Sequence, residues 1–269
     1  MNTKDIILGD RLFCIFKGEP KTGKTVASGS FPDPYFIDCD GRIRSLVRAF
    51  PGKSIEYDTF TDFWEVCKKI ESLNERCDYG TVVVSSLTSL ANMCIEYSLK
   101  FRGATTGEDS KKKDKGGLTR GNIPLTDVSD WGVEYRGLSR VVEGLKSLPC
   151  HVILEAHVIS VEKNNIMTGT STVSRRLMTG AKGIAAYLPT MFDEAYHFHV
   201  ESEAFSSGPP KFLARTTHSA DDWAGTVLGL PPTIEWTNRN FFDLIKYYIK
   251  NPVKKDELSS IPIESPFGS

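Results

Sequence analysis

The chain has 269 residues, of which 40% are hydrophobic and 25% are charged, a composition typical of a globular protein. Its 33 basic and 34 acidic residues nearly cancel, so any affinity for nucleic acid must come from local patches. No apolar run approaches the ~20 residues of a membrane span, the first residues lack the apolar core of a signal peptide, and no cysteines form a CxxC pair. We therefore expect a soluble, cytoplasmic protein with reduced thiols.

Strand-like and helix-like segments alternate in the first half of the chain. Short apolar runs, typical of buried parallel strands, predict strands at residues 12–16, 34–38, 81–84 and 151–154. Apolar residues at helical spacing predict helices at residues 60–73, 87–101 and 131–148. This alternation predicts an α/β fold in which helices flank a mostly parallel, twisted sheet.

Two polar segments interrupt the alternation, at residues 103–128 and 158–182. Both are longer than ordinary connections, so we expect irregular loops that are either functional or disordered. Residues 193–200 and 211–217 flank a Gly-Pro-Pro turn and predict an antiparallel hairpin that extends the sheet.

A helix is expected over residues 240–250, and the Pro- and Ser-rich residues 251–269 are expected to be a disordered tail. We therefore predict one domain over residues 1–250.

The first predicted strand is followed by a glycine-rich motif that fits G-x-x-x-x-G-K-[ST] at every position. It reads Gly18-Glu19-Pro20-Lys21-Thr22-Gly23-Lys24-Thr25 and is followed by Val26. The two glycines let the backbone curl so that consecutive N–H groups face phosphate oxygens. Lys24 would bridge the β- and γ-phosphates, and Thr25 would place its hydroxyl on Mg²⁺. The motif therefore predicts a site for ATP and Mg²⁺.

Two aspartates, Asp38 and Asp40, follow the second predicted strand. Being two apart, they would share one face of an extended strand, and ligands of open α/β sheets lie beyond the carboxyl ends of the strands. One of them could orient the attacking water or hold Mg²⁺ through water. The alternative is an ordinary Asp-Gly turn.

The third predicted strand runs into Ser85, where P-loop NTPases usually carry an aspartate that supports Mg²⁺. A serine hydroxyl is a weaker, neutral ligand. Either Asp38 or Asp40 then takes over the metal, or hydrolysis is slow or absent.

The fourth predicted strand leads to Glu155 and His157, which point the same way. A polar residue at such a strand end can sense the γ-phosphate and pass its presence to the next loop. The alternative for His157 is a hydrogen-bonded structural histidine.

In this order and spacing, the P-loop, the turn from Asp38 to Gly41 and the two later strands resemble the RecA-like P-loop ATPases. The likeness covers about residues 8–250. It is strongest to small phage-encoded, core-only members associated with single-strand annealing and recombination. It implies that Asp40 is the catalytic carboxylate, that the metal-supporting aspartate falls on Ser85, and that the two polar segments line a DNA path.

The resemblance also implies a ring or filament in which a basic residue of one subunit reaches the γ-phosphate bound to its neighbour. The candidates are Lys182, Arg175, Arg176 and Arg215. Single-stranded DNA is the expected partner, because basic residues outnumber acidic ones between Arg102 and Arg120 and phosphate contacts give sequence-independent affinity. The candidate DNA contacts are Lys111, Lys112, Lys113, Arg175 and Arg176. The alternative is a solvated charged loop.

The last residues mix acidic side chains with Pro266-Phe267. Bacterial single-strand binding proteins end in acidic tails with Pro-Phe that recruit partners, so such a protein is a second candidate partner. Because this chain continues to Gly268-Ser269, the alternative is a plain disordered end.

We predict an ATP-binding, ATP-hydrolysing protein that acts on single-stranded DNA in recombination or annealing, in the host cytoplasm if it is phage-encoded. Lys24 and Thr25 would hold phosphate and Mg²⁺, Asp40 would position water, and His157 would report the nucleotide state. One alternative is a nucleotide-gated DNA-binding scaffold without turnover, which Ser85 motivates. A second is a small-molecule kinase with residues 158–182 as its lid.

Overall fold

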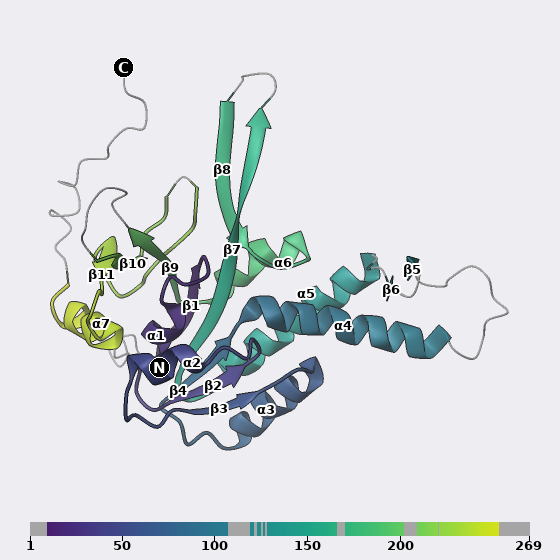
Figure 1. Cartoon of the computed structure of the whole chain (residues 1–269), viewed down its shortest axis with the longest axis horizontal. Coiled ribbons are helices and arrows are strands. Elements are labelled where there is room, and N and C mark those ends of the chain that lie inside the picture. The colour runs from purple at the N-terminus through teal and green to yellow at the C-terminus, as the bar shows by residue number, and fades with distance from the viewer. Residues whose placement is uncertain are drawn as a thin grey trace, which may run out of the picture.

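A computed structural model shows a mixed sheet with helices against its two faces (Figure 1). The residues that it describes are 10–106, 119–120, 123–124, 126, 128–165, 170–201, 209–219 and 221–252.

The sheet follows the order β11-β10-β9-β1-β7-β4-β2-β3, and β8 pairs with β7 off this path. Its strands are β1 (Phe13–Gly18), β2 (Pro34–Asp38), β3 (Glu56–Thr59), β4 (Thr81–Ser85), β7 (His151–Asn165), β8 (Thr170–Leu177), β9 (Glu194–Glu201), β10 (Lys211–Arg215) and β11 (Thr233–Glu235). The strands from β9 to β3 are parallel, whereas β10, β11 and β8 join antiparallel. The carboxyl ends of the parallel strands therefore meet at one edge of the sheet.

The helical elements connect these strands. They are α1 (Lys24–Gly29), α2 (Arg44–Ala49), α3 (Phe63–Glu75), α4 (Leu87–Thr106), α5 (Val128–Lys146), α6 (Lys182–Tyr187), the 3₁₀ helix η2 (Leu188–Met191) and α7 (Phe241–Lys250). A separate pair of two-residue strands, β5 (Thr119–Arg120) and β6 (Ile123–Pro124), lies between α4 and α5 in the chain.

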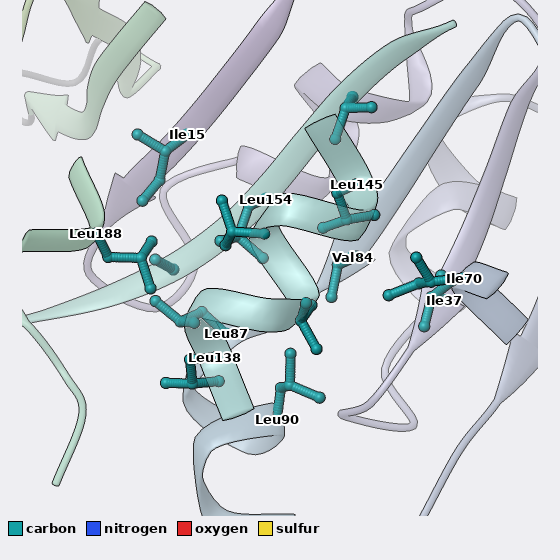
Figure 2. Packing of buried hydrophobic residues seen from close by; sticks show 14 of the residues in the cluster. Ile15, Ile37, Ile70, Val84, Leu87, Leu90, Leu138, Leu145, Leu154 and Leu188 are labelled. Carbon is teal, nitrogen blue, oxygen red and sulfur yellow. The ribbon is translucent and has the colours of Figure 1, made fainter. Parts of the chain in front are cut away.

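Two hydrophobic cores form because the buried strands carry apolar side chains on both faces. In β1, Phe13 and Ile15 belong to one core, whereas Cys14 and Phe16 belong to the other. Figure 2 shows the first core, in which leucines of α4 and α5 pack against the strand residues Ile15, Ile37, Val84 and Leu154. On the opposite face, Phe241 and Ile245 of α7 pack in the second core. The two cores hold the sheet from both faces and so position the edge where the carboxyl ends of the parallel strands meet.

The predicted fold class is confirmed: the sheet is mostly parallel, helices flank it, and β9 and β10 form the expected antiparallel hairpin. The four predicted parallel strands are present, and β2 has the predicted bounds. The edge strand β3 has no counterpart in the sequence prediction. All four of its residues are exposed, so it lacks the apolar pattern on which the prediction rested.

The prediction of an irregular loop at residues 158–182 is wrong. Strand β7 continues to Asn165 and pairs with β8 from Val158↔Leu177 to Asn165↔Thr170. The two strands form a long hairpin that rises beyond the rest of the sheet (Figure 1), and we call these paired strand segments (residues 158–165 and 170–177) the arm. Because much of the arm is covered by no other layer, its strands need no apolar face, and their polar sequence was misread as a loop.

The other segment expected to be irregular, residues 103–128, lies only partly within the described residues. Helix α4 extends into it as far as Thr106, and Lys111, Lys112 and Lys113 lie outside the described residues. The predicted tail also lies outside them from residue 253 onward.

Candidate nucleotide-binding site

The glycine-rich motif connects the end of β1 to the start of α1. Gly18 and Gly23 have φ angles of 157° and 86°. A Cβ atom on Gly18 would lie 2.2 Å from the carbonyl oxygen of Phe198, and one on Gly23 would lie 2.6 Å from the Trp236 ring. Both positions therefore require glycine, and they give the loop the curled course that the motif predicts.

Lys24 lies at the centre of this loop and is almost fully buried. Its Nζ donates to the carbonyl oxygens of Gly18, at 3.0 Å, and Glu19, at 2.8 Å. Burial lowers the pKa of Lys24 to about 8, against the opposing effects of Glu155, Asp40 and Glu19. The loop thus holds one ammonium group against its own backbone.

A buried carboxylate lies beneath the loop. Glu155 Oε2 accepts hydrogen bonds from Thr25 Oγ1 and Ser85 Oγ, both at 2.8 Å, and Oε1 accepts one from Ser28 Oγ at 2.7 Å. Burial raises the pKa of Glu155, whereas these three hydroxyls and Lys24 lower it. The P-loop threonine and the serine that ends β4 are therefore joined through one carboxylate on β7.

Two more polar residues, Asp40 just after β2 and His157 on β7, lie close to each other near the loop. Asp40 Oδ1 accepts a hydrogen bond from Ser86 Oγ at 3.0 Å, and Asp40 Oδ2 lies 4.0 Å from His157 Nε2. Burial lowers the pKa of His157 and nearby Lys24 lowers it further, while Asp40 opposes them. The two residues that the sequence assigned to water positioning and sensing thus face each other.

Asp38 has a different place from the one that the sequence predicted. Strand β2 ends at Asp38 and the chain turns, with Gly41 at a φ of 65°, so the two aspartates do not share an extended backbone. Asp38 Oδ1 accepts from the backbone N–H groups of Asp40, at 3.1 Å, and Gly41, at 2.9 Å. Asp38 shapes the Asp-Gly turn, and Asp40 is the member of the pair that lines the cavity.

A cavity of about 480 Å³ opens above these groups, a size typical of small-molecule sites. Residues 20–26 of the glycine-rich motif line it, together with Asp40, Arg42, Ser45, Ser85, Ser86, Glu155, His157 and Phe212. The sequence analysis missed Arg42, Ser45 and Phe212, which carry no motif. It considered Glu155, with His157, as a candidate sensor of the γ-phosphate and did not connect it to Thr25.

Two of the basic residues proposed to act on a neighbouring subunit have acidic partners in this chain. Arg175 pairs with Asp221, and Arg215 NH2 lies 2.8 Å from Asp222 Oδ2. Arg176 lies on β8, and Lys182 begins α6. All four lie outside the nucleotide cavity lining, and their action in a neighbouring subunit stays a prediction.

The parallel sheet, the terminal antiparallel hairpin and the G-x-x-x-x-G-K-T loop at the end of β1 define an α/β P-loop NTPase. A family model described as an AAA domain matches residues 12–221. The chain therefore belongs to this family of nucleotide-binding P-loop ATPases.

The structure is similar to that of the flagellar accessory protein FlaH from Methanocaldococcus jannaschii, with a TM-score of 0.40 and 10% identity over 84% of each chain. A comparison with curated proteins finds no match.

In the part of the chain that the structure describes, no helix has the length and apolarity needed to cross a bilayer.

Proposed function

We propose that the chain is a cytoplasmic ATPase that couples ATP binding and hydrolysis to the binding of single-stranded DNA, in recombination or annealing. The observation that carries this proposal is the course of one strand. β7 places Glu155 and His157 in the nucleotide cavity and continues without interruption into the arm (Figure 1). A change at the phosphate site therefore has a direct mechanical route to a projecting element.

The phosphate end of the site has the groups that phosphoryl transfer needs. Lys24 supplies a cation within the loop, and Arg42 lies at the cavity. The hydroxyls of Thr25 and Ser85 and the carboxylate of Asp40 form an all-oxygen set, which fits the chemistry of Mg²⁺. These groups would hold Mg²⁺, which when bound would offset the negative charge of the phosphates.

Asp40 is the residue placed to act on the attacking water. Its Oδ1 is fixed by the hydroxyl of Ser86, and its Oδ2 faces His157. A carboxylate held on one oxygen presents the other to accept a hydrogen bond from water, which orients the nucleophile. His157, paired with Gly18 across β1 and β7, would then respond to whether the γ-phosphate is present.

The base of the arm is tied to the body of the domain. The ion pair of Arg175 with Asp221 fixes β8, and Glu134 of α5 accepts hydrogen bonds from the backbone N–H groups of Gly180 and Ala181. Arg176 adds positive charge to the same strand. We propose that the arm carries DNA contacts, together with the lysines at 111–113, through sequence-independent phosphate contacts.

We further propose that the protein works as a ring or filament, with a basic residue of one subunit completing the site of the next. Arg176 and Lys182 are the better candidates, because Arg175 and Arg215 already pair with acidic residues of their own chain. Mixing each alanine variant with the Lys24→Ala variant would test this. Activity recovered only in the mixture supports a shared site.

The decisive experiment is ATP hydrolysis with and without single-stranded DNA. We expect turnover that DNA stimulates and that Lys24→Ala abolishes. Salt should weaken the stimulation, because phosphate contacts release counterions. If DNA changes neither ATP binding nor turnover, the DNA proposal fails and the nucleotide proposal stands alone.

A second function follows from Ser85, which brings no charge to the end of β4. If the missing charge prevents hydrolysis, the protein binds ATP without turning it over, and nucleotide binding controls DNA binding. The same assay separates the two: ATP-dependent DNA binding without measurable hydrolysis favours the scaffold. Asp40→Asn sharpens the result, because loss of a water-positioning carboxylate should lower turnover by about 10²-fold or more while ATP binding persists.

A further inference from the structure

The carboxylate of Glu155 is surrounded by hydroxyl groups. It lies on β7, its residue is 2% exposed, and both oxygens are engaged, Oε2 by Thr25 and Ser85 and Oε1 by Ser28. Each of these partners is a neutral donor. The negative charge of Glu155 therefore stays uncancelled by any of the three hydrogen bonds.

The direction of the hydrogen bonds to Glu155 determines which atoms of the hydroxyl groups stay available to bind a cation. A hydroxyl group has one hydrogen and two lone pairs, and its lone pairs are turned toward a cation when its hydrogen is donated to an acceptor on the opposite side. Glu155 takes the hydrogens of Thr25 and Ser85. Their lone pairs are then left for the cavity that both residues line. Acceptors behind a ligand orient it in this way and increase its electron density.

The position of Glu155 explains how the chain manages without an aspartate at the end of β4. β4 and β7 are neighbours, and Val84 pairs with Leu154 in their register. Ser85 and Glu155 are therefore the next residues along two adjacent strands. P-loop NTPases usually carry a metal-supporting aspartate at the position where β4 ends in Ser85, and here a carboxylate lies on the neighbouring strand β7 instead.

We propose that Glu155 is the positioning residue for Mg²⁺ in this protein: it holds the hydroxyls of Thr25 and Ser85 toward the metal and supplies the negative charge that Ser85 lacks. This inference rests on the proposed function, because it assumes that the cavity binds a nucleotide with Mg²⁺. It also replaces the expectation that Asp38 takes over the metal, since Asp38 is engaged in the turn.

The test measures binding rather than turnover. The affinity for N-methylanthraniloyl-ADP is determined by fluorescence in Mg²⁺ and in EDTA, and the ratio of the two affinities is called the magnesium gain. We expect Glu155→Gln to lower the magnesium gain by about 10- to 100-fold, the usual cost of losing a group that orients a metal ligand. Affinity in EDTA should stay close to that of wild type, because Lys24 and the loop backbone are unchanged.

Two further variants keep the result interpretable. Ser85→Asp combined with Glu155→Gln moves the carboxylate back to β4, and we expect it to restore much of the magnesium gain. Glu194→Gln is the matched control, since Glu194 is also a buried carboxylate on the same sheet, hydrogen-bonded by Tyr196 and Val227. It should leave the magnesium gain unchanged. Circular dichroism and binding in EDTA establish that each variant is folded.

Each outcome decides one claim. A wild-type magnesium gain that Glu155→Gln retains overturns the role of Glu155 and leaves the proposed function intact. A gain that falls equally in Glu194→Gln also overturns it, because the loss would then follow from any buried carboxylate. If the wild-type protein binds the nucleotide in neither condition, the proposed function fails first and this inference fails with it.

Discussion

Two buried carboxylates near the end of β1 are satisfied in opposite ways. Glu155 beneath the P-loop accepts from three neutral hydroxyls. Asp222, in the segment after β10, pairs with cations instead: its side chain is fully buried and contacts Lys17 and, at 2.8 Å, Arg215. It also lies 2.6 Å from Nδ1 of His197. Both sites bury a carboxylate, but one surrounds it with neutral donors and the other with charged partners.

The difference lies in what happens to the charge. At Asp222, burial opposes ionisation, but His197 and Lys17 hold its pKa well below the usual range, and the cations of Lys17 and Arg215 cancel the negative charge. Lys17, His197 and Arg215 lie side by side on β1, β9 and β10, so Asp222 fixes three strands to one another. At Glu155 the three hydrogen-bond donors are neutral, so none of them cancels a negative charge on the carboxylate. We therefore interpret Asp222 as structural and Glu155 as functional.

The largest expected effect is that of Asp222→Ala on stability. It would leave buried cations without a counter-charge, which typically costs about 3–5 kcal/mol. Urea unfolding measures the change in the free energy of unfolding. Asp243→Ala is the control, because Asp243 pairs with Lys246 at the surface and exposed pairs contribute little. A cost for Asp222→Ala as small as that of the control would remove the distinction between the two sites.

A smaller effect is expected when a second carboxylate is added next to Glu155. Ser85→Asp alone would place two acidic groups where one hydroxyl now donates to Glu155. Like charges in a buried site and added volume each disfavour the native state, and we expect a loss of about 2 kcal/mol. In the Glu155→Gln background the same substitution should cost less. Equal costs in the two backgrounds would show that Glu155 carries no charge there.

The comparison also shows how far the sequence predicts such a site. The glycine-rich motif located Lys24 and Thr25, because consecutive residues in one loop leave a recognisable pattern. Asp40 and His157 followed from the rule that polar residues at the carboxyl ends of parallel strands meet at one edge. The link from Thr25 to Glu155 spans 130 positions in the chain and depends on the strand order, with β7 between β1 and β4. No local pattern encodes that order.

The same reasoning explains the misread elements. The apolar runs of β1, β4 and β7 reflect burial on both faces, so they predicted strands correctly. The arm and β3 were not predicted as strands because backbone pairing stabilises them while many of their side chains are polar or exposed. Asp38 was misplaced because a strand end was assumed to continue for two more residues. Sequence patterns report burial well and strand ends poorly.

The last expected effect is a pH dependence that Lys17 contributes at the Asp222 site. Burial lowers the pKa of Lys17 to about 8, although Asp222 opposes the shift, whereas an unfolded lysine titrates near ~10.4. Between these values the unfolded chain holds a proton that the folded protein has released, so stability rises with pH across this window. Relative to Lys17→Met, which has no titrating group at this position, the wild type should gain roughly 2 kcal/mol between pH 8 and pH 10. Urea unfolding of both proteins across this range measures the difference and cancels the titration of other groups. If the difference in unfolding free energy between the two proteins is flat or falls with pH, Lys17 keeps its proton in the folded state. The ion pair with Asp222 would then outweigh the effect of burial on Lys17, and the charge of Asp222 would be compensated more strongly than we infer.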